Sequence, residues 1–417
     1  MEKSGKFRLT SLERNWILYD VGNSAFVLMV ATLIPIFFNA LAAAGGLSSV
    51  EYLAYWGYAS SAVTIITAVL SPILGTVADT KGFKKPIFIL CVFVGIVGCC
   101  AMGAVSAWLP FLVIFVIAKV GFSGSLVFYD SMLSDVTTPE RMDEVSSRGY
   151  AWGYIGSCIP FVVCLGLVLG AGSIGISQMT ALNLALLLTA AWWLLTTLPL
   201  LKSYKQLYYV EVEKHAVRQS FARIGHTLRH LPEDKQVFWF LLAFFCYIDG
   251  VYTIIDMATA YGTALGLDTT GLLLALLVTQ IVAFPSALVF GRLSNKYPSA
   301  KLIPVCIAAY AGIAVFAFFL TRQWQFWVLA VIVGMFQGGV QALSRSHFAK
   351  IIPPEKSGEY FGLFDICGKG ASFLGTMIVS VGSQLTGSAN VGVGSLILLF
   401  IVGFVLFRVS CRQSETA

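Results

Sequence analysis

Long apolar runs follow one another along almost the whole chain, and no other feature of the sequence limits the possible fold as strongly. From Trp16 to Arg408, only short polar breaks interrupt these runs. The hydrocarbon core of a bilayer is about 30 Å thick, and a helix crosses it with roughly 20 apolar residues. Only 12% of the 417 residues are charged, against about 25% in soluble domains. The chain is therefore predicted to be an integral membrane protein.

The polar breaks divide the apolar runs into twelve segments of spanning length. Every backbone polar group inside a bilayer needs a partner within the protein, so only helices and closed barrels cross it. The alternating ten-residue pattern of barrel strands is absent from the sequence. We therefore predict an all-α membrane protein with spans near 16–43, 50–77, 86–105, 109–133, 147–170, 177–200, 236–262, 269–291, 300–320, 324–346, 359–384 and 389–408.

The positions of the basic residues predict the orientation of these spans. With the N-terminus inside, the seven cytoplasmic segments hold 24 of the 27 Lys and Arg residues. The six opposite loops hold only Arg322, and the other two basic residues lie within spans. Cytoplasmic loops of membrane proteins carry an excess of Lys and Arg. We therefore expect both termini to be cytoplasmic.

The longest polar break follows the sixth span and divides the chain into two halves of six spans each. The predicted domains are residues 1–200, a cytoplasmic linker at 201–235, and residues 236–417. The loops after spans four and ten are similar, reading TPERMDE at 138–144 and PPEKSGE at 353–359, an offset of 215 residues. Two six-helix parallel repeats around a central site are typical of carriers that open alternately to the two sides.

Apolar residues recur at helical spacing within the linker. They are Val217, Phe221, Ile224, Leu228 and Leu231, opposite Arg218, Arg223 and Arg229. This pattern predicts an amphipathic helix that lies on the lipid of the inner leaflet. The alternative is a solvated linker.

The loop between the second and third spans resembles the signature loop of major facilitator transporters. It reads GTVADTKGFKK at 75–85, with Gly75, Asp79, Gly82, Lys84 and Lys85 in register. The resemblance implies that this loop latches the cytoplasmic ends of the two halves together and governs the conformational switch.

Three longer strings narrow this resemblance, which covers nearly the whole chain. They read LYDVGNSAF (18–26), FYDSMLSDVTTPERMDEVSSRGYAWGYIG (128–156) and GGVQALSRSHFAKIIPPEKSGEYFGLFDICGKGASFLG (338–375). They resemble the branch that contains the fungal vacuolar effluxer of the autophagy pathway and its bacterial relatives. The resemblance implies a major facilitator fold and efflux-type transport, with amino acids as the substrates of the fungal member. The expected location is the inner (plasma) membrane of a bacterium.

Seven Asp, Glu, Lys or Arg residues lie inside the predicted spans and more than two residues from either end. They are Asp20, Lys119, Asp130, Asp249, Asp256, Asp365 and Lys369. A charge within a bilayer is costly unless it is paired or hydrated, so each of them is a functional candidate. In the fold that the chain resembles, spans one, four, seven and ten line the central cavity. Polar residues on these spans are therefore candidates for contact with substrate, and they include Asn23, Tyr252, Gln337 and Gln341.

The predicted substrate site lies at the middle of spans four and seven. Lys119 is about ten residues into span four, and Asp249 and Asp256 lie seven residues apart on one face of span seven. We predict that Lys119 binds a carboxylate, and that one of the two acids binds an ammonium group while the other carries the coupling proton. Asp20 and Asp130 are further candidates for proton coupling. The alternative for Lys119 is that it pairs with an Asp of another span and holds the halves in register.

A second group of residues is predicted to act in gating. Asp365 and Lys369 are four residues apart with the acid first, which favours an ion pair along one helix. Arg345, at the inner end of span ten, is a possible third member of that pair. Asp79 and Arg148 are expected to be latch residues at the cytoplasmic face.

The sequence predicts a transporter that needs no cofactor or metal. It holds no GxxxxGK[ST] loop, so ATP is not the expected energy source. The net charge of +6 is explained by cytoplasmic loops that face anionic lipid, so nucleic acid is not an expected partner. The expected partners are a small-molecule substrate, protons and membrane lipid, and the expected state is a monomer.

These features favour a secondary transporter for a small polar metabolite such as an amino acid, either proton-coupled or facilitative, and working in efflux. Two alternatives remain open: an exporter of amphipathic drugs, and a receptor with a transporter fold and no net flux. An enzyme is the weakest hypothesis, because the spans hold no Ser/Lys, His/Asp or metal-binding constellation.

Overall fold

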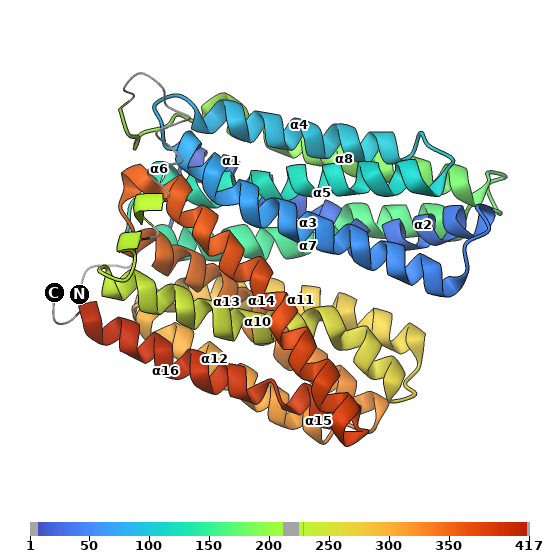
Figure 1. Cartoon of the computed structure of the whole chain (residues 1–417). Coiled ribbons are helices and arrows are strands. Elements are labelled where there is room, and N and C mark those ends of the chain that lie inside the picture. Colours follow the sequence, from blue (N-terminus) through green and yellow to red (C-terminus); the bar gives the residue numbers. More distant parts are fainter. Residues whose placement is uncertain (1–6, 212–224, 228, 415–417) are drawn as a thin grey trace.

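The computed structural model describes residues 7–211, 225–227 and 229–414. This part of the chain is almost entirely helical (Figure 1). The helices are α1 (Ser11–Ala31), α2 (Leu33–Ala44), α3 (Ser49–Ala78), α4 (Lys84–Met102), α5 (Trp108–Ser131), α6 (Leu133–Val136), α7 (Met142–Leu169), α8 (Gln178–Ser203), α10 (Lys235–Ala264), α11 (Thr269–Leu293), α12 (Ser299–Phe318), α13 (Gln323–Ile351), α14 (Ser357–Thr386), α15 (Ala389–Gly394) and α16 (Ile397–Ser414). A 3-10 turn, η1 (Pro354–Lys356), precedes α14.

Local sequence signals set several helix ends. The side chains of Thr10 and Ser48 each accept a hydrogen bond from the backbone N–H of the glutamate three residues later. The side chain of that glutamate accepts a hydrogen bond from the backbone N–H of the cap residue. Such capping boxes satisfy two of the backbone N–H groups that have no partner at a helix start. The first span is broken at Thr32, because the ring of Pro35 clashes with the carbonyl four residues earlier.

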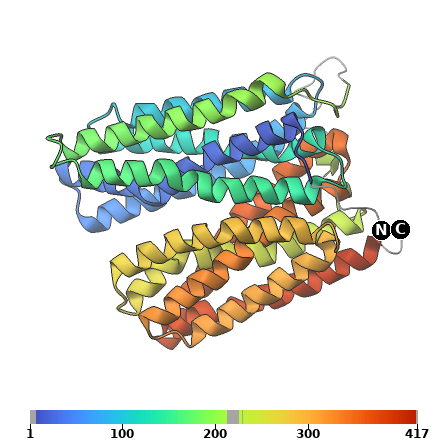
Figure 2. The ribbon, with the colours of Figure 1, turned by 180° about the vertical axis from the view of Figure 1, so that it is seen from behind.

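Twelve membrane-spanning units of the described chain form two bundles that lie side by side (Figures 1 and 2). Helices α1–α8 make one bundle and α10–α16 the other, and they contact each other mainly where α3 packs on α14 and α7 packs on α11. The predicted fold class is therefore confirmed. We call the end of the bundle where both termini lie the terminal side, and the opposite end the distal side.

The connection between the two bundles begins as an extended segment. Helix α8 runs to Ser203, and the residues that follow return to the loop between α3 and α4, where Val210 pairs with Thr80 in a single β-bridge. Most of the residues that predicted an amphipathic linker helix, Val217, Phe221, Ile224 and Leu228, lie outside the described residues.

Candidate functional site

Arg345 of α13 is the centre of the charged contacts between the two bundles. Its Nη1 lies 2.9 Å from Oδ1 of Asp130 on α5 and 3.8 Å from Oδ2 of Asp20 on α1. Its Nε donates to Oγ of Ser146 on α7, at 2.9 Å. The side chain is only 2% exposed. An arginine from one half is thus held by three helices of the other.

Aromatic rings surround the same guanidinium. Its carbon lies 4.3 Å from the ring centroid of Tyr150 and 4.8 Å from that of Trp16. Cations over aromatic faces are attracted by the ring quadrupole, and more strongly where water is excluded. In the sequence, Arg345 was a possible third member of the Asp365–Lys369 pair. That expectation is wrong, because Arg345 points to the N-terminal half, where Asp20 and Asp130 together compensate its charge.

Asp130 and Arg345 occupy equivalent positions in the two internal repeats. The two positions are 215 residues apart, the same offset that aligns 138–144 with 353–359. Two equivalent positions of such repeats can be in contact only where both lie close to the axis that relates the repeats. An acid in one repeat and a base in the other therefore form an ion pair where identical residues would repel each other.

The latch loop meets the start of α14. Asp79 is completely buried, and its two carboxylate oxygens accept hydrogen bonds from the backbone N–H groups of Gly358 and Glu359, at 2.7 and 2.8 Å. These amides belong to the first turn of α14, which has no acceptors within the helix and favours a negative charge. A Cβ atom at Gly75 would overlap the carbonyl of Gly358, so the glycine permits the close approach of α3 to α14.

Lys84 links the same loop to both halves. Its Nζ donates to Oγ of Ser357 at 2.9 Å, and it lies 3.4 Å from Oδ2 of Asp135 and 3.9 Å from Oδ1 of Asp79. Gly82 takes a positive φ of 79° in the turn between Asp79 and Lys84, a conformation that costs glycine little. Lys85 points back to the N-terminal half, where its Nζ donates to the carbonyl of Tyr204 at 3.5 Å.

Acidification is expected to stabilise the closed latch. Burial and the nearby Glu359 raise the pKa of Asp79 to about 7, although Lys84 and the two amide donors favour its ionised form. In an open latch the hydrated carboxyl returns toward its ordinary pKa of about 3.9. The closed state then binds more protons between these two values. Its population relative to the open state should therefore rise about tenfold from about pH 8 to about pH 6.

Hydrogen–deuterium exchange at the amides of Gly358 and Glu359 measures this equilibrium. After correction for the intrinsic pH dependence of exchange, these amides should exchange more slowly at the lower pH. The Asp79→Asn variant should lose the difference, because an amide does not titrate. A difference of equal size in that variant would assign the effect to another group.

The second repeat carries a related contact. Asn295, in the loop after α11 that corresponds to the latch loop, donates from Nδ2 to Oε2 of Glu144 on α7, at 2.7 Å. Arg148 pairs with Oε1 of the same Glu144 at 2.6 Å and lies over the ring of Phe7. Arg148 therefore acts on the interface only through Glu144, and does not reach the C-terminal half itself.

Lys119 and Asp256 come from opposite halves and face the space between them. Lys119 Nζ lies 4.7 Å from the ring centroid of Phe122, and no acidic oxygen of the described residues is within ion-pair distance of it. Asp256 is exposed, and its charge interacts with that of Lys119. The alternative in which Lys119 is already paired with an Asp is not what the structure shows.

Asp249 lies in a different environment from Asp256, although both are on α10. It is completely buried, and its Oδ1 accepts hydrogen bonds from the backbone N–H of Gly375 at 2.9 Å and from Thr253 Oγ1 at 3.3 Å. Its Oδ2 has no hydrogen-bond partner among the described residues. A Cβ atom at Gly375 would come within 2.6 Å of Oδ1. The two acids, seven residues apart on one continuous helix, therefore differ in environment: Asp249 is enclosed between α10 and α14, whereas Asp256 is exposed.

Asp365 and Lys369 form the predicted pair on α14, with 2.6 Å between Oδ2 and Nζ. Ser71 of α3 also donates to Oδ2 of Asp365, at 2.7 Å. Lys369 is near enough to Lys119 for their charges to interact. The pair therefore belongs to the α3–α14 interface and borders the space that holds Lys119.

The other predicted polar residues have varied surroundings. Gln341 accepts a hydrogen bond from the Tyr154 hydroxyl of the other half at 2.8 Å, whereas Oε1 of the buried Gln337 has no partner. Asn23 donates to the carbonyl of Tyr19 on its own helix. Tyr252 packs near Gly368 of α14.

Several interface residues were missed from the sequence. Asp143 of α7 accepts a hydrogen bond from Ser346 and pairs with Lys350 at 2.6 Å, which adds another link between the halves. Asp135 forms an ion pair with Lys84 and accepts a hydrogen bond from Tyr204 at the start of the linker. Both acids lie outside the apolar runs, in the polar loop after span four. Charged residues are ordinary in such a loop, so their position did not mark them as functional candidates. Among the described residues, no group of His, Cys, Asp or Glu has metal-site geometry.

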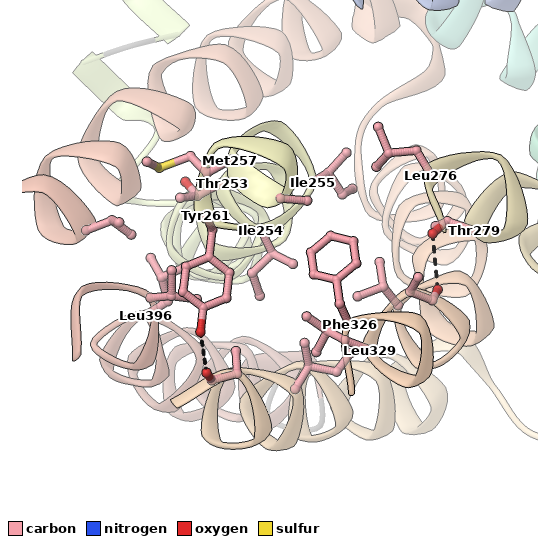
Figure 3. A pocket seen from close by; sticks show the side chains of 17 residues that line it. Thr253, Ile254, Ile255, Met257, Tyr261, Leu276, Thr279, Phe326, Leu329 and Leu396 are labelled. Atoms are coloured by element: carbon pink, nitrogen blue, oxygen red, sulfur yellow. Dashed lines mark hydrogen bonds between the residues drawn. The ribbon is translucent and has the colours of Figure 1, made fainter. Parts of the chain in front are cut away.

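An apolar pocket lies inside the C-terminal half, and its lining includes neither Lys119 nor Asp256. It encloses about 620 Å³ of empty space, part of it open to solvent, between α10, α11, α12 and α13 (Figure 3). Its polar atoms are already used: Tyr261 donates to the carbonyl of Ala317, and Thr279 to those of Ala275 and Ala330. Thr253, which also lines the pocket, donates to Asp249. The described lining is otherwise apolar and offers no charged side chain to orient a charged substrate.

The twelve spans, their two halves and the charged residues between the halves define a membrane transporter of the major facilitator class. Solved transporters share this fold. The human organic anion transporter MFSD10 (TETRAN) has a TM-score of 0.72 at 14% identity, over 95% of this chain and 98% of that one. FucP in its outward conformation has a TM-score of 0.71 at 17% identity, over 96% and 97%.

Within that class, the chain belongs to the family of Atg22-like vacuole effluxers, which it matches over residues 11–416. It is 42% identical to the MFS-type transporter YxiO of Bacillus subtilis (strain 168) over 414 residues, 98% of this chain and 97% of YxiO. It is 28% identical to autophagy-related protein 22 of Saccharomyces cerevisiae (strain ATCC 204508 / S288c) over 283 residues, 58% of this chain and 53% of the fungal protein. The alignment thus spans about half the length of the fungal relatives.

Proposed function

We propose that this protein is a secondary active transporter that exports a small zwitterionic metabolite, such as an amino acid. The observation that supports this most directly is the pair of opposite charges, Lys119 and Asp256, which come from the two halves and interact electrostatically without an ion-pair contact among the described residues. An amino acid carries a carboxylate and an ammonium group, and so complements both. The family name, vacuole effluxer, supports the direction.

The proposed orientation places the terminal side in the cytoplasm of a bacterium. The excess of Lys and Arg in the loops of that side supports it. The structure then corresponds to a state closed toward the cytoplasm, in which Arg345, Asp79 and Lys84 join the halves and the Lys119 region is reached from outside. Opening toward the cytoplasm requires these contacts to break, while the distal ends of the halves come together.

Asp249 is our candidate for the group that carries the coupling proton. The Asp249→Asn variant should fold, because its oxygen still accepts from Gly375 and its NH₂ group replaces an oxygen that has no partner. The permanently neutral side chain can no longer exchange a proton. We therefore expect the variant to lose the response of proteoliposome uptake to an imposed pH gradient.

The control for this prediction is Asp256→Asn. That variant should lower substrate affinity because it removes a proposed ammonium partner, and its remaining uptake should still respond to the gradient. A full response to the pH gradient in Asp249→Asn would exclude Asp249 as the coupling residue.

The substrate class is tested first by thermal shift. A ligand that binds the folded state raises its stability by mass action, by about 2.7 kcal/mol at a concentration of 100 times Kd. Amino acids should stabilise the wild-type protein, and the Lys119→Ala variant should not respond to them. Stabilisation by amphipathic drugs alone, unchanged in Lys119→Ala, would favour a drug exporter instead.

A further inference from the structure

The first residues of the connection between the halves fold back onto the latch loop. We call residues 204–210 the strap. Its backbone pairs with the start of the turn: Val210 N–H donates to the carbonyl of Asp79 at 2.8 Å, and Lys81 N–H donates to the carbonyl of Val210 at 3.2 Å. The strap thus holds the backbone of the residue whose side chain binds the start of α14.

Gln206 holds the same turn from both ends. Its Oε1 accepts a hydrogen bond from the N–H of Gly82 at 3.0 Å, and its Nε2 donates to the carbonyl of Ala78 at 3.1 Å. Lys81 lies over the ring of Tyr209, with 4.9 Å from Nζ to the centroid. One polar side chain therefore links the end of α3 to the tight part of the loop.

Asp135 joins the strap to the latch through its carboxylate. The strap supplies three donors to it: the Tyr204 hydroxyl at 2.6 Å to Oδ2, and the backbone N–H groups of Leu207 and Tyr208, each at 2.9 Å to Oδ1. The fourth donor is Lys84 Nζ, at 3.4 Å to Oδ2. Both ionic side chains are completely buried, and a buried carboxylate is held firmly where several donors satisfy it.

Lys84 connects Asp135 to the C-terminal half. The same ammonium that contacts Asp135 donates to Ser357 at 2.9 Å, and Ser357 is the first residue of α14. The chain of contacts therefore runs from the strap to Asp135, to Lys84, and to the helix whose next two amides bind Asp79. Removing the strap would leave Asp135 with Lys84 as its remaining described donor.

We infer that the strap is a working part of the gate: Tyr204 and Gln206 are positioning residues that hold Lys84 and Asp79 in the geometry that closes the terminal side. The connection between the halves then does more than join them, because any displacement of its first residues loosens the latch. This inference concerns the equilibrium between closed and open states, and does not depend on the identity of the substrate.

Hydrogen–deuterium exchange of the full-length protein in lipid nanodiscs tests the inference. The readout is exchange at the amides of Gly358 and Glu359, which neither positioning residue touches. Tyr204→Phe removes one hydroxyl that donates to a buried carboxylate, and should raise exchange at both amides about tenfold. Gln206→Ala should act in the same direction. Leu207→Ala is the matched control, since its side chain is 60% exposed while its amide still donates to Asp135.

Two results would overturn the inference. One is faster exchange at Leu207 and Tyr208 in Tyr204→Phe with unchanged exchange at Gly358 and Glu359, which would make the strap a local packing element. The other is an equal rise in all peptides, including the distal α15, which would indicate general destabilisation. If Gln206→Ala does not fold, Tyr204→Phe alone decides, because it deletes a single oxygen.

Discussion

Replacing Arg345 with alanine is expected to destabilise the closed terminal side by about 3–5 kcal/mol, which is the usual cost of removing one member of a buried ion pair. The loss of the guanidinium leaves Asp130 without its partner at 2.9 Å and Asp20 without a compensating charge. It also leaves a void between the rings of Trp16 and Tyr150. The shift corresponds to about a hundredfold or more in the population of the open state.

Hydrogen–deuterium exchange of the peptides at the start of α7 and the end of α13, together with the unfolding temperature, measures this effect. Arg408→Ala, at an exposed position of α16, is the matched control and should change neither. The triple variant Arg345→Gln, Asp130→Asn, Asp20→Asn should be milder than Arg345→Ala alone, because no unpaired charge is left buried. Wild-type exchange and stability in Arg345→Ala would show that the pair contributes nothing to closure.

Lys119→Ala is expected to abolish transport while leaving the protein folded. Among the residues that the structure describes, Lys119 makes no ion pair, and its ammonium lies over the face of Phe122. Its removal therefore breaks no described salt bridge. A substrate carboxylate that loses Lys119 as a cationic partner should bind and cross at least about a hundredfold less well, since charge-assisted bonds contribute about 1.5–3 kcal/mol each in protein and more without water.

Uptake into proteoliposomes, with an amino acid found by thermal shift, measures this loss. Lys119→Arg keeps the charge and should retain part of the activity, whereas Lys296→Ala, at an exposed loop position, should behave as wild type. An unchanged unfolding temperature separates lost binding from lost folding. Transport at the wild-type rate in Lys119→Ala would remove the basis for the proposed site.

The sequence alone was sufficient for the fold class. The number of spans follows from counting apolar runs that are long enough to cross a bilayer. The bilayer permits only helices and closed barrels, and each spanning helix needs an apolar segment of roughly 20 residues. The repeat at an offset of 215 residues was also readable, since both copies keep their loop residues. The ionisable residues within the spans could be selected for the same reason, as their cost in lipid makes them rare.

Only the tertiary structure decided which charged residues pair with each other. Arg345 was a possible third member of the Asp365–Lys369 pair, yet it pairs with Asp130 and Asp20 of the other half. The packing of α13 against the N-terminal helices brings these residues together. Asp249 and Asp256 share a helix and a spacing, yet one is enclosed against Gly375 and the other is open. Helical periodicity gives the direction of a side chain from its own axis, but not which helix packs there or whether water reaches it.

The role of Asp135 and the strap shows the same limit. In the sequence, Asp135 is one acid in a polar loop, and residues 204–210 are the start of a linker. Only the folded chain brings the strap within hydrogen-bond distance of the carboxylate and of the latch loop. The sequence by itself therefore determined the spans, the repeat and the set of charged residues. The packing of the two halves decided which charges pair, which stay open to substrate, and how the linker reaches the latch. The physical reason is that membrane insertion depends on the composition of each segment, whereas pairing depends on distances between segments far apart in the chain.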